Sequence, residues 1–280
     1  MNQMNRRHAV IFDLDGTLLD SLKDLADSVN FALREVGLPV LPSEFYRMLV
    51  GSGNIELCQR AQVVATLLEA DRQGKLDLLA CRLGLADVGL PLGTTSLEPV
   101  WLDCARDQTC RQPIADPDLA QTLFEIFQIR YRATWRDNTK LYPGISEVLD
   151  NLYAAGFPFS VYSNKDEALV HDIMRFCARP ELFAVVKGKA KGAALKPDPA
   201  ISLEIAQTMT VPPERVLFFG DSDVDIRTAR NARMIPIGVT WGFRPKEELS
   251  GAGAMRLIDH PNEIESVVWE WEKNADAIFK

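Results

Sequence analysis

The stretch AVIFDLDGT, residues 9–17, joins a short apolar run directly to two acidic residues, a glycine and a threonine. A wholly apolar run of this length is typical of a strand buried on both faces of a parallel sheet. Open parallel sheets place their ligand sites at the carboxyl ends of their strands. We therefore interpret residues 9–12 as the first strand and the polar residues after it as a candidate site.

Asp13 and Asp15 stand two positions apart, so in extended backbone both side chains face the same side while Leu14 points elsewhere. Two neighbouring carboxylates repel each other unless a hard dication holds them together, and oxygen ligands of this kind favour Mg²⁺. Gly16 permits a sharp exit from the strand. A solvated acidic turn remains the alternative interpretation of this segment alone, whereas an EF-hand loop lacks its glutamate and its spacing.

Further apolar runs indicate that this strand is one of several. They lie at residues 157–162, 183–186, 216–219 and 235–239, and helical patterns lie between most of them. One helix is predicted over residues 145–153, with Gly156 as its stop, and a closing helix is predicted around residues 264–271. Strand and helix alternation of this kind predicts an α/β fold with a parallel sheet.

The segment between the first strand and Lys140 has a different character, because it shows no convincing strand. A helical series begins at Leu22, a second helix is expected from about Asn54 to Glu69, and a third begins where Asp116 can cap and Pro117 can occupy the first turn. Residues 71–115 have no clear pattern. We predict a catalytic core of residues 1–19 and 140–280, interrupted by a helical cap domain of residues 20–139.

The composition excludes several classes of protein. The 280 residues are 47% hydrophobic and 25% charged, as in an ordinary globular protein, and the net charge is −8. We expect neither nucleic acid nor an anionic membrane as a partner, and an anionic substrate would need a local positive site. No run of about eighteen apolar residues exists, and Asp13 comes too early for a signal segment, so a cytoplasmic location is expected.

The five cysteines are odd in number and show no CxxC spacing, which argues against zinc and against a disulfide framework. A bridge between Cys104 and Cys110 stays possible, with buried thiols in a reducing compartment as the favoured interpretation. The three histidines are scattered and are interpreted as surface or packing residues.

Three further polar segments occur in the same context as the first. Ser163-Asn164 follows one predicted strand, KPDP at residues 196–199 precedes a helix, and GDSDVD at residues 220–225 follows another strand. Together with DLDGT they resemble, in order and context, the four motifs of the haloacid dehalogenase superfamily. The resemblance covers roughly residues 8–20 and 140–260, and it implies a Rossmann-like core with an inserted α-helical cap.

The resemblance implies a role for each motif residue. Asp13 would be the nucleophile that forms an aspartyl-phosphate, and Asp15 would be the general acid and base, with its backbone carbonyl on the metal. Ser163 and Asn164 would donate hydrogen bonds to phosphoryl oxygens, and Lys196 would neutralise the nucleophile and the phosphate. Lys187, Lys189 and Lys191 are rival lysines, and the KPDP context favours Lys196.

The metal would be Mg²⁺, with Asp13, Asp15 and Asp221 as its ligands. Gly220 and Asp225 would support the site, since a spacing of four would put Asp225 and Asp221 on one helix face. Asp223 is interpreted as a solvated loop residue, and Thr17 as a residue that orders the turn and can bond a phosphate oxygen.

Asp15 separates branches of the superfamily, because the dehalogenases lack this acid and the phosphatases and mutases retain it. The sequence resembles most the group of phosphoglycolate phosphatases, through residues 12–33, the loop at residues 50–53, LYPG and GDSDVDI. The cap would close over the phosphate site and exclude water. Arg47, Gly51 and Ser52 are candidate specificity residues of the cap, with an ordinary turn between helices as the alternative.

The resemblance therefore implies a Mg²⁺-dependent phosphatase acting on a small phosphorylated metabolite similar to phosphoglycolate. A phosphosugar mutase similar to β-phosphoglucomutase is an alternative, as is a pyrophosphatase or nucleotidase on the same core, because the core motifs recognise the phosphoryl group alone. A scaffold protein on a degenerate core is disfavoured by the presence of Asp13 and Asp15. Monomer and homodimer both remain open.

Overall fold

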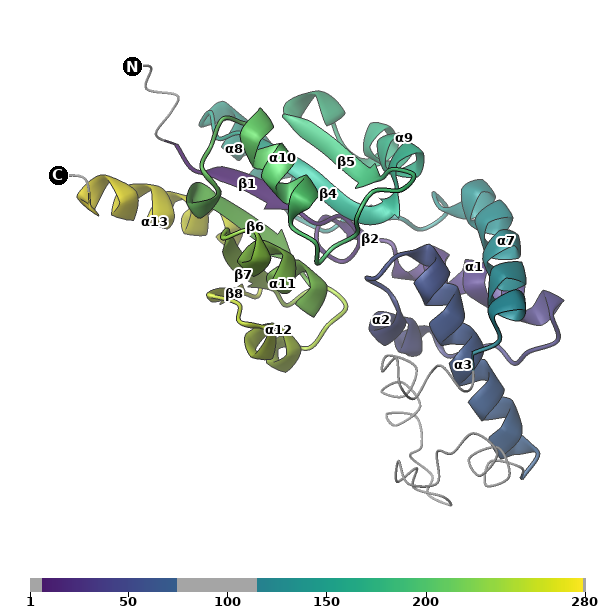
Figure 1. The fold of residues 1–280 in the computed structure, drawn as a ribbon. Coiled ribbons are helices and arrows are strands. Elements are labelled where there is room, and N and C mark those ends of the chain that lie inside the picture. Colours follow the sequence, from purple (N-terminus) through teal and green to yellow (C-terminus); the bar gives the residue numbers. More distant parts are fainter. Residues whose placement is uncertain (1–6, 75–114, 279–280) are drawn as a thin grey trace. The chain divides into compact units, whose positions relative to one another are not determined.

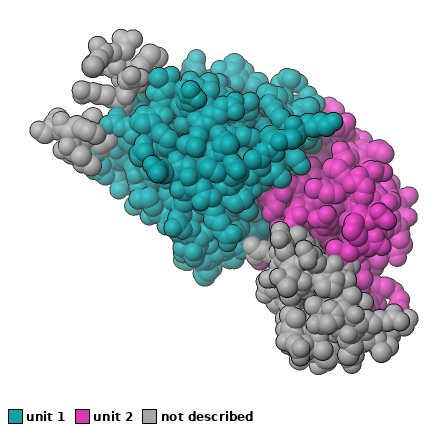
Figure 2. Space-filling model, in the orientation of Figure 1, with its two compact units in different colours: residues 1–21, 138–280 teal, residues 22–137 magenta. Residues whose placement is uncertain are grey.

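The computed structural model describes residues 7–74 and 115–278. The chain divides into two compact units, coloured separately in Figure 2. The larger consists of Met1–Ser21 with Asn138–Lys280, and the smaller is Leu22–Asp137. None of the described helices is long and apolar enough to cross a membrane.

The larger unit is built on a parallel sheet of six strands (Figure 1), in the order β5-β4-β1-β6-β7-β8. The strands are β1 (Ala9–Phe12), β4 (Phe159–Asp166), β5 (Val185–Lys189), β6 (Val216–Gly220), β7 (Ile235–Val239) and β8 (Arg256–Ile258). The chain adds β4 and β5 on one side of β1, and then β6, β7 and β8 on the other. A reversal of this kind opens a crevice at the carboxyl end of β1, where doubly wound sheets bind ligands.

Both faces of this sheet are covered, because successive strand residues point to opposite sides. On one face Ile11, Tyr162 and Phe218 belong to a buried cluster that includes residues of α10 (Ala200–Thr208) and α11 (Asp223–Asn231). On the other face the ring of Phe12 packs against those of Phe159 and Phe219, with ring centroids 6.4 Å and 5.5 Å apart. The predicted α/β fold with a parallel sheet is confirmed.

The remaining helices of this unit include the two that the sequence predicted. They are α8 (Ile145–Ala154), α9 (Glu167–Cys177), α12 (Lys246–Ala252) and α13 (Glu263–Ile278). Gly156 follows α8 with a φ of 76°, a left-handed conformation that suits glycine and ends the helix. Trp269 on α13 packs edge-on against Phe157 with the ring centroids 4.9 Å apart, so the closing helix joins the core of the sheet. His8 is buried, and its Nδ1 lies 2.8 Å from Oε2 of Glu272 on α13.

Two of the predicted strands have different bounds in the structure, and one strand was not predicted. The strand expected at residues 157–162 begins at Phe159, after Pro158, and continues to Asp166, so Ser163 and Asn164 lie within it. The strand expected at residues 183–186 is Val185–Lys189, and β8 was not expected. Both are edge strands, whose half-exposed faces carry lysine, arginine and glycine, and a search for wholly apolar runs overlooks them.

A short antiparallel pair links the two passages of the chain between the units. β2 (Leu19–Asp20) pairs with β3 (Lys140–Leu141), and the amide of Tyr142 donates to the carbonyl of Leu18 at 3.0 Å. Two-residue strands lie below the length at which alternation can be recognised in a sequence, so this pair of strands was not predicted.

The smaller unit is helical, as its sequence pattern predicted. Its elements are α1 (Leu22–Glu35), a 3₁₀ turn at Ser43–Phe45, α2 (Tyr46–Leu49), α3 (Asn54–Arg72) and α7 (Pro117–Thr134). Asp116 caps α7, because its side chain accepts hydrogen bonds from the amides of Asp118 and Leu119, both at 3.0 Å. Helix α3 runs three residues past the expected end. Residues 75–114 of the stretch without a clear pattern lie outside the described residues, and so do Cys104 and Cys110.

Candidate active site

The turn after β1 brings Asp13 and Gly16 to the crevice. The amide of Asp13 donates to Phe219 on β6 at 2.9 Å, so the backbone of Asp13 continues the sheet. Gly16 has a φ of +88°, and a Cβ at this position would lie only 2.3 Å from Oδ2 of Asp221. The glycine therefore serves both the turn and the close approach of the Asp221 carboxylate.

Replacing Gly16 by alanine should lower the free energy of unfolding by about 3 kcal/mol or more, because strain and overlap add. Gly192 is a matched control, since its φ is +78° but nothing lies within 4 Å of the added Cβ. Gly192→Ala should cost only about 1 kcal/mol, from the backbone conformation alone. Urea unfolding of both variants measures the difference, and equal losses would contradict the close approach.

Three buried carboxylates and one lysine form the centre of the site. One oxygen from each of Asp13, Asp221 and Asp225 lies within 4.8 Å of the others. Lys196 Nζ contacts both Asp13 Oδ1 and Asp225 Oδ1 at 2.6 Å, and its side chain is 2% exposed. The four groups carry three negative charges against one positive, so the cluster is short of positive charge.

The pKa values of the groups in the cluster reflect this shortage of positive charge. Burial and the charge of Asp225 raise the pKa of Asp13 well above its usual value, against the opposing effect of Lys196. Burial and Asp225 likewise raise the pKa of Asp221 to about 7. Burial acts to lower the pKa of Lys196, but Asp13 and Asp225 outweigh it, so this pKa is raised. A bound cation would relieve the repulsion between the acids.

The donor set fits a hard divalent cation, because it offers only oxygen atoms. Asp225 is the least available of the three acids: its Oδ1 contacts Lys196, and its Oδ2 accepts from the amide of Ser222 at 3.1 Å and from the Ser222 hydroxyl at 2.5 Å. Asp221 Oδ2 accepts from the amide of Phe243 at 2.8 Å, which orients that carboxylate. Asp13 and Asp221 are the side chains that would hold the ion, and Asp225 positions Lys196.

Stabilisation by Mg²⁺ should depend on pH. Burial is the main cause that raises the pKa of Asp221 from its usual 3.8 to about 7 in the folded chain. As the pH rises through this window the unfolded state loses the proton first, so the metal-free protein loses stability toward neutral pH. We therefore expect Mg²⁺ to raise the Tm more at about pH 8 than at about pH 5. Thermal melts at both pH values measure this, and an equal rise would contradict it, while Asp221→Asn should remove the response.

Asp15 lies in a second polar cluster that includes a residue the sequence analysis missed. Asp15 Oδ1 accepts hydrogen bonds from Ser21 Oγ at 2.5 Å and from Lys165 Nζ at 2.7 Å. Lys165 directly follows Ser163-Asn164, and its side chain is 2% exposed. A lysine within a buried strand was the signal that could have revealed it, had the true length of β4 been recognised.

Asn164 fixes the loop that carries Lys196. The amide of Lys196 donates to Asn164 Oδ1 at 2.8 Å, and Asn164 Nδ2 donates to the Lys196 carbonyl at 3.2 Å. Ser163 Oγ accepts from the amide of Lys165 at 3.2 Å.

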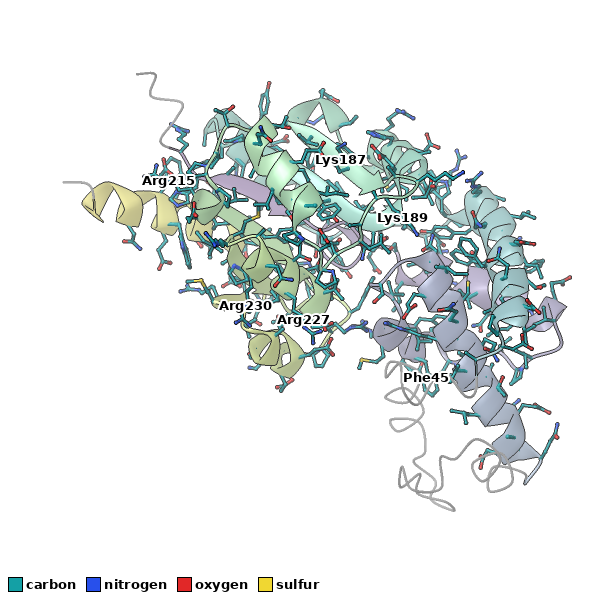
Figure 3. All side chains as sticks on the ribbon, in the orientation of Figure 1. Phe45, Lys187, Lys189, Arg215, Arg227 and Arg230 are labelled. Atoms are coloured by element: carbon teal, nitrogen blue, oxygen red, sulfur yellow. The ribbon has the colours of Figure 1, made fainter. Side chains whose placement is uncertain are left out.

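Two of the rival lysines lie at a different position from Lys196. Lys187 and Lys189 lie on β5 (Figure 3), and Lys187 pairs with Glu204 at 3.3 Å.

The predicted geometry of the last motif was wrong in one respect. Asp221 lies before α11 rather than on it, since Ser222 caps the helix and Asp223 is its first residue. Asp225 is the third residue of α11 and forms a capping box with Ser222. It meets Asp221 because its side chain reaches back toward the turn, not because the two share a helix face. Gly220 permits this, since a Cβ there would lie 2.1 Å from Cβ of Asp225. Asp223 pairs with Arg227 at 3.0 Å.

The loop after β7 also contributes to the site, although no motif marked it. Trp241 Nε1 donates to the carbonyl of Thr17 at 3.0 Å, and a Cβ on Gly242 would lie 2.2 Å from Cβ of Asp221. Thr17 is buried, and its hydroxyl lies 3.4 Å from Asp221 Oδ1. The only sequence signal for this loop was its place at the carboxyl end of a predicted strand.

The candidate cap residues lie together in the smaller unit. Arg47 belongs to α2, and Gly51 and Ser52 lie in the turn before α3, where Gly51 has a φ of +118°. Ser52 Oγ accepts from Arg60 Nη2 at 3.0 Å. Their part in specificity stays a prediction.

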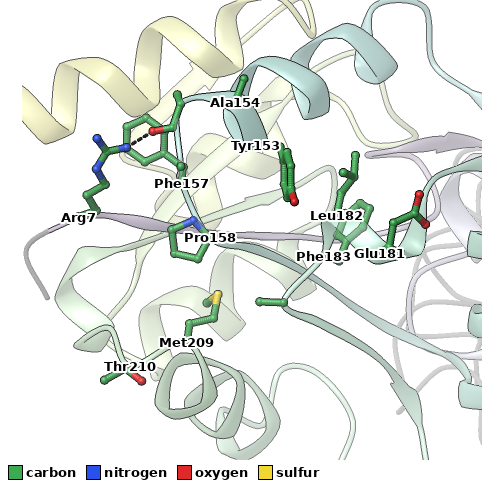
Figure 4. A pocket seen from close by; sticks show the side chains of 13 residues that line it. Arg7, Tyr153, Ala154, Phe157, Pro158, Glu181, Leu182, Phe183, Met209 and Thr210 are labelled. Carbon is green, nitrogen blue, oxygen red and sulfur yellow. Dashed lines mark hydrogen bonds between the residues drawn. The ribbon is translucent and has the colours of Figure 1, made fainter. Parts of the chain in front are cut away.

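A second hollow lies at the opposite edge of the sheet. It has a volume of about 990 Å³ and is lined by Phe157, Pro158 and Ala184, which precede β4 and β5, and by Met209 and Arg7. Figure 4 shows Arg7 at its rim, hydrogen-bonded to the carbonyl of Ala155. Its apolar walls offer no cluster of buried acids and bases, so the carboxyl edge remains the candidate active site.

Buried acids and lysines at the reversal point of a parallel sheet define an α/β enzyme built to hold an anion together with a cation. A family model described as haloacid dehalogenase-like hydrolase matches residues 8–233. The chain belongs to this family of hydrolases, and the predicted resemblance is confirmed.

Individual relatives narrow the class. The chain is 31% identical to a phosphoglycolate phosphatase of Mannheimia succiniciproducens, with 98% of this chain and 99% of that one covered. It is 29% identical to the phosphoglycolate phosphatase of Escherichia coli K12, with 89% and 87% covered. A crystal structure of a predicted phosphoglycolate phosphatase from Haemophilus somnus matches with a TM-score of 0.72 at 25% identity, over 94% of this chain and 99% of that one. These matches place the enzyme among the phosphatases, the phosphoric monoester hydrolases.

Proposed function

We propose that the chain is a Mg²⁺-dependent phosphatase that hydrolyses a small phosphomonoester related to 2-phosphoglycolate through an aspartyl-phosphate. The observation that carries this proposal is the contact of one buried lysine with Asp13 and Asp225, beside Asp221, at the carboxyl end of β1. The relatives named as phosphoglycolate phosphatases support the substrate class.

The chemistry requires two half-reactions. An oxygen of Asp13 attacks phosphorus, the bond from phosphorus to the ester oxygen breaks, and Asp15 gives its proton to the leaving oxygen. Water then attacks the aspartyl-phosphate, Asp15 takes a proton from it, and inorganic phosphate leaves with Asp13 restored. When bound, Mg²⁺ supplies positive charge against which the phosphoryl oxygens are held.

The remaining residues of the site orient the phosphoryl group and neutralise its charge and that of Asp13. Lys196 balances charge on Asp13 and on the phosphoryl group, and Ser163 and the backbone of Asn164 donate to phosphoryl oxygens. Asn164 also holds the Lys196 loop, as its two hydrogen bonds to that residue indicate. We place the enzyme in the cytoplasm, acting on a soluble metabolite without nucleic acid or membrane as partner.

The experiment is phosphate release from a panel of phosphorylated metabolites, with Mg²⁺ and with a chelator. We expect release from small monoesters, including 2-phosphoglycolate, only when Mg²⁺ is present. A phosphosugar mutase would instead interconvert isomers and require a bisphosphate primer, and a pyrophosphatase or nucleotidase would prefer those substrates. Release that is unchanged by the chelator would contradict the metal requirement.

A further inference from the structure

The ammonium group of Lys196 lies against two aromatic rings as well as against the buried carboxylates. Its Nζ lies over the ring of Tyr162 on β4, 5.4 Å from the centroid, and over the ring of Phe218 on β6, 5.8 Å from the centroid. These two strands flank β1, and both rings belong to one buried cluster. A cation within about 6 Å of a ring centroid is attracted by the negative face of the ring. The rings therefore add a second kind of attraction to that of the carboxylates.

Hydrogen bonds alone occupy the donors of this ammonium group. Lys196 Nζ donates to Asp13 Oδ1 and Asp225 Oδ1, both at 2.6 Å, and to the carbonyl oxygen of Tyr162 at 3.2 Å. Three is the number of hydrogen bonds that an ammonium group can donate. Because the side chain is only 2% exposed, the two ring faces lie where water would surround an exposed ammonium group.

The hydroxyl group of Tyr162 makes no hydrogen bond with the described part of the chain, although Tyr162 is only 1% exposed. Burying a hydroxyl group without a partner costs free energy. The polar end of the side chain is therefore unfavourable where it lies. Its ring, whose face lies against the ammonium group, is the favourable part.

The proposed reaction disturbs one of these contacts and leaves the others. When phosphorus esterifies Asp13, the carboxylate loses its negative charge, and the N–H group that Asp13 accepted from turns to a phosphoryl oxygen. The contacts of Lys196 with Asp225, with the Tyr162 carbonyl and with the two rings involve no reacting atom. These contacts can hold the ammonium group in one place while the charge on Asp13 disappears and returns.

We infer that Tyr162 and Phe218 are positioning residues, whose ring faces hold the ammonium group of Lys196 against Asp13 and the phosphoryl group. Both rings act through Lys196. The catalytic consequence of this inference rests on the proposed function, whereas the attraction between the rings and the ammonium group can be tested without turnover.

The test lowers the electron density of the ring and nearly keeps its shape. Tyr162→Phe retains the ring, and replacement of Tyr162 by 3,4,5-trifluorophenylalanine adds fluorine atoms that withdraw electrons from the face that attracts a cation. Relative to Tyr162→Phe, the trifluorinated enzyme should have a kcat lower on the order of tenfold, without a rise in KM. A ring with one fluorine should give an intermediate loss, and trifluorination of Phe218 should act in the same direction.

Phe159 is the matched control, because it also lies on β4 and its ring packs edge-on against those of Phe12 and Phe183, with centroids 6.4 Å and 4.9 Å away. Trifluorination of Phe159 should leave kcat unchanged. An equal kcat for Tyr162→Phe and its trifluorinated counterpart would overturn the inference. An equal loss at positions 159 and 162 would overturn it as well, because the effect would then come from packing.

Urea unfolding in Mg²⁺-free buffer adds a readout that needs no substrate. With Lys196 present, trifluorination at position 162 should raise the unfolding equilibrium constant on the order of fivefold relative to Tyr162→Phe. In the Lys196→Met background the same change should have no such cost, because no cation lies over the ring. Equal losses in both backgrounds would show that the ring only packs, against the inference. Failure of the proposed function looks different, because the wild type would then release phosphate from no monoester while the dependence on Lys196 persisted.

Discussion

Asp13→Asn should lower kcat by at least about 10⁴-fold with every phosphomonoester, because an amide oxygen cannot form the covalent intermediate that the carboxylate forms. The change is nearly isosteric, and it removes one of the negative charges crowded around Lys196. The variant should therefore still fold. Phosphate release in the presence of Mg²⁺ measures the loss.

Asp172→Asn is the control for this experiment, since Asp172 forms an exposed ion pair with Arg175 at 2.7 Å, away from the carboxyl edge. Its activity should equal that of the wild type. Cooperative urea unfolding of Asp13→Asn is the check on folding. If the variant keeps more than about a tenth of the wild-type activity, Asp13 is not the nucleophile.

Lys196→Met should lower the free energy of unfolding by about 3–5 kcal/mol in Mg²⁺-free buffer, because it leaves two buried carboxylates without their cation. Both contacts measure 2.6 Å, and the side chains of Lys196 and Asp225 are each 2% exposed. Activity should be lost as well, since charge on Asp13 and on the phosphoryl group is no longer balanced. Urea unfolding, monitored by circular dichroism, measures the loss in the free energy of unfolding.

Lys187→Met serves as the control, because Lys187 and Glu204 are 31% and 58% exposed and lie 3.3 Å apart. Exposed pairs of this kind contribute less than about 1 kcal/mol. Added Mg²⁺ should recover part of the stability lost in Lys196→Met, since an ion replaces some of the missing positive charge. A loss below about 1 kcal/mol in Lys196→Met would show that the buried contacts do not hold the site together.

The sequence by itself determined the fold class and the four chain segments of the candidate site. Local signals were enough, because a buried parallel strand must be apolar throughout and its ligand site must follow its carboxyl end. Asp13 and Asp15 were located in this way, whereas Lys196 and Asp221 were assigned through the resemblance to the haloacid dehalogenase motifs. The helices that begin near Leu22 and after Asp116 were recognised from their spacing and caps. The edge strands β5 and β8 were misplaced or missed, because half-exposed strands carry no continuous apolar run.

Only the tertiary structure decided which side chains meet. Lys165 reaches Asp15, 150 positions away in the sequence, and the loop of Trp241 and Gly242 reaches Thr17 and Asp221. Asp225 joins the cluster through a capping box, a geometry that spacing alone misassigned to a helix face. The physical reason is that periodicity reports how a residue lies within its own strand or helix, whereas these contacts depend on the order in which β4, β1, β6 and β7 stand side by side.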